Sequence, residues 1–430
     1  MSDAQVSRQR LVNIVGGSAG NLVEWFDWYV YAAFALYFAP SFFPKGSPTA
    51  QLLSTAAVFA VGFVLRPIGA WVMGMYADRK GRKAGLTLSV SLMCLGSLII
   101  AAAPTYQQAG VISPALLVIA RMIQGLSLGG EYGSSATYLS EMAGRERRGF
   151  WSSFQYVTLI AGQLVALALL LTLQGVLGEQ ALTAWGWRLA FLAGAMLAVV
   201  VYIIRRRLTE TPSFEAIAAK GASGPRSSGT RLFRDHPREA LLVIALTAGG
   251  TLAFYAYTTY MQKYLANTVG FEKVVASRIM TVALTLFILL QPLAGLLSDR
   301  VGRKPVMIFF GTAGALLTVP IFTALETARD PMVAFALVMA SLVIVTGYTS
   351  INAVVKAELF PGHIRALGVA LPFAIANTIF GGTAEYVALW LKDAGHERYF
   401  YYYVAGTIAM SLIAYATMRE TRVTSLIEEE

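Results

Sequence analysis

The chain has 430 residues, of which 56% are hydrophobic and 13% are charged, and its mean hydropathy is +0.60. A soluble domain carries roughly 25% charged residues, so this chain has too few charges to cover the surface of a soluble protein of its length. Its high hydrophobicity also excludes intrinsic disorder. The net charge of +10 could indicate a nucleic-acid or anionic-lipid partner, but the topology described below accounts for it. The composition therefore predicts a polytopic membrane protein.

Twelve stretches are long and apolar enough to cross a membrane, which takes about 20 mainly apolar residues. Since open sheets cannot span lipid, the predicted fold is an all-α polytopic membrane protein with twelve transmembrane helices. Arg8 and Arg10 precede the first apolar run, as in a signal peptide, but this run is long and contains Glu24 and Asp27. We therefore expect a retained first span. The predicted spans are 11–39, 50–76, 84–103, 114–140, 150–176, 184–204, 239–265, 274–298, 305–325, 332–357, 366–390 and 399–418.

The distribution of Lys and Arg predicts the orientation. With both termini in the cytoplasm, 23 of the 34 Lys and Arg residues fall in cytoplasmic segments and 7 in outer loops. The stretch 205–238 begins with three arginines and continues into the segment GASGPRSSG. We expect a solvated cytoplasmic linker there, with a basic helix on the membrane surface as the alternative. The predicted domains are six-helix bundles at 1–204 and 239–430.

Two charged motifs occur twice at nearly the same spacing. The segment GMYADRKGRK at 74–83 follows the second span, and GLLSDRVGRK at 295–304 follows the eighth, 221 residues later. The second pair lies at the ends of the fourth and tenth spans, with an offset of 217 residues: Glu141 and Arg148 correspond to Glu358 and Arg365. The repeats indicate a duplicated six-helix unit.

At these motifs the sequence resembles the major facilitator superfamily, whose loop motif has the form GxxxDRxGRR in each half. It also resembles the metabolite:proton symporters of that superfamily in the segments GNLVEWFD, RPIG, RMIQG and GGE. Within this group it is most similar to the 2-oxoglutarate (alpha-ketoglutarate) permeases, through SFQYVTLIAGQL, YTTYMQKYLANT, VVKAELFP and IFGGTAEYVAL. The resemblance covers the whole chain.

The resemblance implies two pseudo-symmetric bundles that import a small dicarboxylate with protons by alternating access. It further implies a monomer among the lipids of a bacterial inner membrane. Another organic acid (citrate, shikimate or an aromatic acid) and a proline- or betaine-type osmolyte remain alternatives. The chain shows no C-terminal heptads, a feature of many osmolyte transporters in the group, which argues against that branch. A membrane-embedded enzyme or receptor is the rival class, but no catalytic or nucleotide site is visible.

The repeated loop motifs are predicted to form a gate. Asp78 can lie against the N-terminus of a helix from the other half, where the helix dipole favours a carboxylate, and the arginines can pair with Glu141. Such contacts would hold the inner side closed and break when the halves rock; the alternative is that the arginines only fix topology. The candidate gate residues are Asp78, Arg79, Arg82, Glu141, Arg148, Asp299, Arg300, Arg303, Glu358 and Arg365.

Five charged residues lie inside apolar spans, where an unpaired charge is costly and usually faces a cavity or a partner. Estimated depths at ~1.5 Å per residue suggest two pairs, Asp27 with Arg121 and Glu131 with Arg66. Both could also be permanent ion pairs between helices. A symporter needs an acid whose proton affinity responds to substrate, and the candidates are Asp27 or Glu24, followed by Glu131.

A dicarboxylate needs cationic donors, and arginine is best suited to bidentate carboxylate recognition. Arg66 is the first candidate. Lys263 could add a cation from the C-terminal half or snorkel to the interface, whereas Lys356 is assigned to gate or topology. Gln163 and Asn377 could bind a keto group or join helices. The predicted substrate-contacting residues are Arg66, Arg121, Gln163, Tyr257, Lys263 and Asn377.

Several features resemble other sites. The glycines at 16–20 and 129–133 look like phosphate loops, but no strand precedes either, so they indicate close helix packing. The single cysteine and three histidines lack metal-ligand spacing, and no Ser/His/acid set can be assembled. We expect no metal, no cofactor and no nucleic-acid partner.

Overall fold

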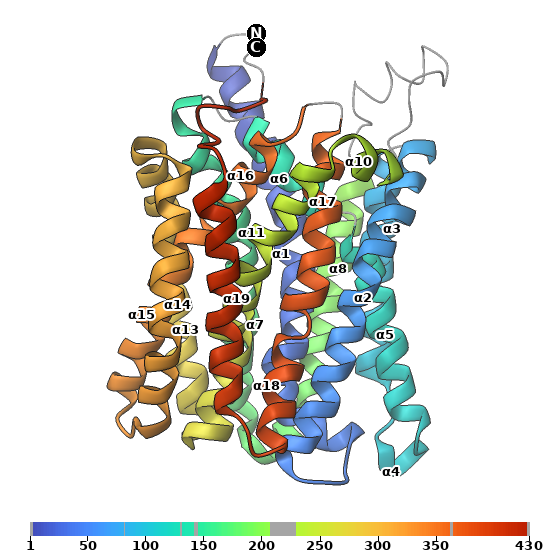
Figure 1. The fold of residues 1–430 in the computed structure, drawn as a ribbon. Coiled ribbons are helices and arrows are strands. Elements are labelled where there is room, and N and C mark those ends of the chain that lie inside the picture. Colours follow the sequence, from blue (N-terminus) through green and yellow to red (C-terminus); the bar gives the residue numbers. More distant parts are fainter. Residues whose placement is uncertain are drawn as a thin grey trace.

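The computed structural model describes residues 3–80, 82–129, 131–141, 145–206, 229–361 and 364–427. Within these ranges the side chains of 3–20, 74, 75, 77–80, 82–86, 131, 134, 135, 138, 141 and 204–206 are also outside the description. Every regular element in the described ranges is helical. The long helices run side by side, and both termini lie at the same end of the bundle (Figure 1).

The N-terminal half contains six helical rods. They are α1 (Asp3–Phe42), α2 (Pro48–Lys80), α3 (Arg82–Ala102), α5 (Ile112–Gly129) continued by α6 (Glu131–Glu141), α7 (Arg148–Ala181), and α8 (Trp187–Arg206) after the π-turn η2 (Leu182–Gly186). Short turns α4 (Tyr106–Ala109) and η1 (Arg145–Arg147) lie between them.

The C-terminal half repeats this plan with more interruptions. Its first rod is α11 (Pro237–Tyr255), η3 (Ala256–Tyr260), α12 (Met261–Tyr264) and η4 (Leu265–Val269). The others are α13 (Lys273–Val301), α14 (Arg303–Thr327), α15 (Pro331–Thr349) with α16 (Asn352–Glu358), α17 (Arg365–Ala376) with η5 (Asn377–Gly381) and α18 (Ala384–Asp393), and α19 (Arg398–Thr417).

These twelve rods of the described chain match the twelve predicted spans to within a few residues at most ends, with α1 starting earlier than predicted. Eight stretches of described helix are long and apolar enough to cross a membrane by length and composition alone. Most of the predicted linker lies outside the described residues. Its last part differs from a solvated coil, because α10 (Gly229–Asp235) forms there and buries Leu232 against Phe360.

Small residues let helices approach closely, as the sequence predicts for 129–133. A Cβ at Gly129 would lie 2.1 Å from the Arg66 carbonyl oxygen, and one at Gly133 would lie 2.4 Å from the Ala370 Cβ of the other half. The prediction that these glycines allow close helix packing is confirmed. The glycines at 16–20 fall outside the described side chains.

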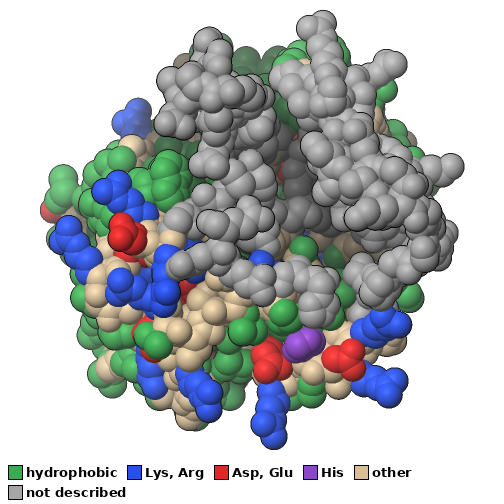
Figure 2. Space-filling view, turned by 90° about the horizontal axis from the view of Figure 1, so that it is seen from above, with side chains coloured by type: hydrophobic (Ala, Val, Ile, Leu, Met, Phe, Trp, Pro, Cys, Tyr) green, Lys and Arg blue, Asp and Glu red, His purple; other side chains and the backbone are tan. Residues whose placement is uncertain are grey.

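The two halves meet through α7 with α13, α2 with α18, and α6 with α17. Seen from the end that carries the termini, the described Lys and Arg side chains gather toward the rim (Figure 2). At the opposite end, a cleft of about 620 Å³ opens between the halves, lined by residues of α1, α2, α7 and α13. One ion pair joins the halves beside it, Lys273 to Glu179 at 2.7 Å.

Candidate functional site

Arg66 lies on α2, buried at 4% exposure among aromatic rings. Its guanidinium carbon is 3.9 Å from the Phe63 ring centroid and 4.2 Å from that of Trp28. Tyr255 of the other half also interacts with this guanidinium. Within the described chain, Nε and Nη2 of Arg66 have no hydrogen-bond partner. Nε and Nη2 are the side-on pair of donors with which an arginine can bind a carboxylate through two hydrogen bonds.

The predicted pair of Arg66 with Glu131 has no counterpart in the described contacts, because the Glu131 side chain lies outside the description. Among the described contacts, ring faces stabilise the charge of Arg66 through cation–π attraction. This arrangement keeps the charge in an apolar span without using up its hydrogen-bond donors.

Asp27 and Arg121 are brought together, but not as the direct ion pair that the depths suggest. Arg121 donates from Nη1 to Gln124 Oε1 at 2.7 Å, and Gln124 donates from Nε2 to Asp27 Oδ2 at 2.6 Å. Ser97 of α3 donates to the other carboxylate oxygen. The side chain of Gln124 fills the space between them, since its amide can accept from the arginine and donate to the acid. Asp27 thus lies inside the N-terminal bundle.

The rings of α1 connect the two arginines. Trp28 lies 3.8 Å from the guanidinium of Arg121 as well as 4.2 Å from that of Arg66. Arg121 is fully buried, and its Nε and Nη2 also lack a hydrogen-bond partner in the described chain. Glu24 is buried separately and accepts from Ser89 at 3.3 Å. Asp27 is thus connected to Arg121 through Gln124.

Lys263 is fully buried and pairs with Glu385 of α18 at 2.9 Å. The snorkelling alternative is therefore wrong, because a snorkelling lysine places its ammonium in the interface. Sequence reasoning missed Glu385, although an acid inside an apolar span is itself a signal. Any substrate role of Lys263 would have to compete with this carboxylate.

Tyr257 is predicted to contact the substrate, whereas its neighbour Tyr255 is not, and the structure places the two differently. Tyr257 bonds to Thr318 inside the C-terminal half at 2.5 Å. Tyr255, two residues earlier, packs against Phe63 of the other half at 5.3 Å between ring centroids. Side chains two apart on a helix point in different directions, so only one of this pair can face the interface.

The predicted keto-group ligands differ in their surroundings. Asn377 is buried, bonds to Thr251 and lies at the start of the π-turn η5 beside Tyr255. Gln163 of α7 is also buried, and its Oε1 has no partner within the described chain. Single π-turns in helices are frequent at functional sites, which favours the neighbourhood of Asn377 and Tyr255.

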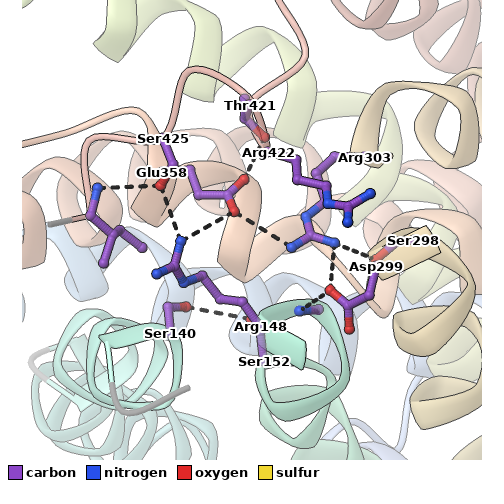
Figure 3. A network of polar contacts seen from close by, with 12 residues as sticks. Ser140, Arg148, Ser152, Ser298, Asp299, Arg303, Glu358, Thr421, Arg422 and Ser425 are labelled. Atoms are coloured by element: carbon purple, nitrogen blue, oxygen red, sulfur yellow. Dashed lines mark hydrogen bonds and ion pairs between the residues drawn. The ribbon is translucent and has the colours of Figure 1, made fainter. Parts of the chain in front are cut away.

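A buried ion network joins the halves at the end that carries the termini (Figure 3). Asp299 of α13 accepts hydrogen bonds from the backbone N–H groups of Gly149 at 2.8 Å and Phe150 at 2.9 Å, in the first turn of α7. A carboxylate is favoured there by the helix dipole and the unpaired amides. Arg303 holds the same carboxylate at 2.7 Å. This is the helix-terminus contact that the sequence predicts for its repeat partner Asp78.

The second gate motif completes the network. Glu358 lies 3.5 Å from Arg303 and 4.0 Å from Arg148 of the other half. Glycine makes the approach possible, because a Cβ at Gly149 would lie 2.7 Å from the carbonyl oxygen of Gly295. The arginines here do more than fix topology.

The chain after α19 covers this network. Glu358 accepts from Thr421 at 2.6 Å, and Arg148 donates to Ser425 at 3.2 Å. Arg365 donates to the Leu426 carbonyl oxygen at 2.8 Å, and Ile427 is buried in the cluster that includes Tyr132. Nothing in the sequence periodicity indicated this tail. Arg300 is exposed, and the side chains of Asp78, Arg79, Arg82 and Glu141 lie outside the described residues.

Two matched halves of membrane-length helices, with buried charges between them and an ion network closing one end, define a membrane transporter. The chain belongs to the Major Facilitator Superfamily, whose family model matches residues 18–384 and 263–426. The predicted superfamily, the twelve-helix fold and the transporter class are confirmed. The relatives are named as permeases, transporters or symporters, not enzymes.

The chain is similar to several relatives along most of its length. The alpha-ketoglutarate permease of Escherichia coli is 53% identical over 409 residues, covering 95% of this chain and 93% of that protein. The citrate-proton symporter of Klebsiella pneumoniae is 32% identical over 89% and 86%, respectively. The proline/betaine transporter of E. coli is 30% identical over 95% and 83%. A solved structure of the proton:xylose symporter XylE matches with a TM-score of 0.77 at 18% identity, covering 96% and 97%, which shows the fold alone.

Proposed function

We propose that this transporter carries a small dicarboxylate, 2-oxoglutarate, together with protons across a bacterial inner membrane. The observation that carries the proposal is the buried guanidinium of Arg66, whose Nε and Nη2 have no partner in the described chain. The relative named alpha-ketoglutarate permease, at 53% identity, supports the choice of substrate. The citrate-proton symporters support the coupling to protons.

The substrate would bind between the halves, with one carboxylate on the Nε and Nη2 fork of Arg66. Asn377 and Tyr255 lie beside that position and could hydrogen-bond the adjacent keto oxygen. Bidentate recognition explains why an arginine rather than a lysine stands at this position. The aromatic walls exclude water, which strengthens the ion pair when the substrate arrives.

Asp27 is the proposed proton site. Gln124, Arg121 and the ring of Trp28 connect it to Arg66. A negative charge that binds at Arg66 can therefore change the electrostatic potential at the Asp27 carboxyl group. Ionisable residues inside membrane spans usually mark functional sites, and proton relays are one such function. Glu24 and Glu131 remain the alternatives for this role.

The gate would work by alternating access with the ion network of Asp299, Arg303 and Glu358 on the cytoplasmic side, where both termini are proposed to lie. Breaking this network would let the halves separate at that end while they close over the cleft at the other. We propose that the monomer, which holds all of these residues, is the functional unit.

Uptake of labelled 2-oxoglutarate into proteoliposomes tests the proposal. We expect uptake to rise with an inward proton gradient and to fall when a protonophore is added at constant membrane potential. Competition by citrate, succinate, glutamate and betaine, each in excess, ranks the substrate classes. Uptake without any proton dependence would refute the symport, and inhibition by betaine alone would replace the dicarboxylate by an osmolyte.

A further inference from the structure

Lys356, like Arg66, is a buried cation at the interface between the halves. It lies on α16 of the C-terminal half and is fully buried. Its Nζ donates to Asn352 Oδ1 at 2.8 Å and to the Tyr132 hydroxyl at 3.3 Å. No carboxylate of the described residues lies within ion-pair distance of it, in contrast to Lys263, which has Glu385. A buried ammonium without a counter-ion is costly, so a structural role explains it poorly.

The surroundings of Lys356 match those of Arg66 in kind. The Nζ atom lies 4.0 Å from the Phe373 ring centroid and 5.4 Å from that of Tyr132. Those two rings are themselves stacked at 3.8 Å across the interface. Ring faces stabilise a cation without occupying its hydrogen-bond donors. Lys356 has three donors, and its hydrogen bonds to Asn352 and Tyr132 leave one of them for a ligand.

A series of tyrosine interactions links the surroundings of the two cations. Tyr255 interacts with Arg66, and Tyr156 interacts with both Tyr255 and Tyr348. Tyr348 lies on the same helical rod as Lys356, and its ring centroid is 5.9 Å from the Nζ atom of that lysine. Hydroxyl groups of this kind can hydrogen-bond a polar ligand that extends from one cation to the other.

We propose that Lys356 binds the distal carboxylate of the dicarboxylate, while Arg66 binds the carboxylate next to the keto group. This inference rests on the proposed function and deepens it. One cation comes from each half, so only a substrate with a carboxylate at both ends can neutralise both. A monocarboxylate of the same length would leave one buried charge unpaired. Lys356 thereby selects for dicarboxylates and links ligand binding to the approach of the halves.

Binding to the purified protein tests the inference, with two ligands and two variants. The ligands are 2-oxoglutarate and 2-oxopentanoate, which has the same five-carbon chain but no distal carboxylate. In Lys356→Met, affinity for 2-oxoglutarate should fall by roughly a hundredfold or more, because a charged partner of a desolvated pair is lost. Affinity for 2-oxopentanoate should change less than about threefold, since that contact was never made.

A stability readout separates a ligand role from a structural one. Lys356→Met removes a buried charge that has no counter-ion, so the thermal midpoint of the ligand-free protein should stay the same or rise. Lys263→Met is the matched control, since its lysine has a carboxylate partner, and there the midpoint should fall. A lower midpoint in Lys356→Met, or an equal loss of affinity for both ligands, would overturn the inference. So would unchanged binding of 2-oxoglutarate. If the parent protein bound no 2-oxoglutarate at all, the proposed function itself would fail first.

Discussion

Replacing Asp299 by asparagine should destabilise the closed state of the gate without changing the contacts of the substrate site. The carboxylate accepts two backbone hydrogen bonds from α7, at 2.8 and 2.9 Å, and an ion pair from Arg303 at 2.7 Å. Asparagine has nearly the same shape but keeps only one accepting oxygen and no charge. Both backbone bonds join the two halves, so the loss falls on the state in which this end is closed.

The expected magnitude follows from these contacts. A hydrogen bond to a charged group contributes about 1.5–3 kcal/mol, and the carboxylate gains about 0.3–1 kcal/mol from the helix dipole. Losing one such bond and the charge therefore costs the closed state about 2–4 kcal/mol. A difference of about 3 kcal/mol shifts the equilibrium between closed and open states roughly a hundredfold.

Cysteine labelling measures this shift. Ala136 is fully buried on α6 in the cluster between the halves, so Ala136→Cys in a Cys94→Ser background should react with a maleimide only when this end opens. Asp299→Asn should raise the labelling rate up to roughly a hundredfold. Asp235→Asn, an exposed acid at the same end, is the matched control and should leave the rate unchanged.

Two results would contradict this reasoning. Labelling of Asp299→Asn at the rate of the parent would mean that the carboxylate does not hold the gate. An equal loss of 2-oxoglutarate binding and uptake would instead place Asp299 in the substrate site, whereas we expect binding to persist while uptake falls.

Three further outcomes are expected. Asp27→Asn should abolish the dependence of uptake on the proton gradient. Exchange of internal for external substrate, measured in preloaded vesicles, should remain unchanged. If uptake still depended on the proton gradient, the proton site would have to be another residue. Lys263→Met should destabilise the protein by ~3–5 kcal/mol because Glu385 is left buried and unpaired. Adding Glu385→Gln should restore the thermal midpoint. A double variant that folds but no longer binds 2-oxoglutarate would show that Lys263 contacts the substrate. Deleting residues 421–430 removes Ile427 and its contact with the interface, which should destabilise the closed state by about 1–2 kcal/mol. Labelling of the Ala136→Cys reporter should then rise by roughly tenfold. An unchanged labelling rate would show that this tail contacts only its own half.

The spans and the gate were predictable because the sequence carries direct signals for both. A helix that crosses lipid must be apolar over its whole length, so a window of that length finds its ends. The gate motif was visible as a repeat, and its helix-terminus contact follows from the carboxylate of Asp299 and the dipole of α7. The prediction named the contact for the first repeat, and the described residues show it in the second.

The interior of the site was predictable only in part. Depth along a helix placed Asp27 near Arg121, but the bridging Gln124 depends on side-chain direction, which depth does not contain. The choice between Tyr255 and Tyr257 depends on the rotation of a rod that contains the π-turn η3, where the helical period changes. Glu385 was overlooked among apolar neighbours.

The geometry around Trp28 gives a physical reason why substrate and proton should move together. The guanidinium groups of Arg66 and Arg121 both contact the Trp28 indole ring, and each carries a charge in a region of low dielectric. Two such charges repel each other far more than in water. A carboxylate bound at Arg66 offsets this repulsion. The hydrogen bond from Arg121 to Gln124 must then change in strength, and with it the bond from Gln124 to Asp27. Coupling in this arrangement needs no large movement within the N-terminal half, because the signal is electrostatic and passes through side chains that already touch.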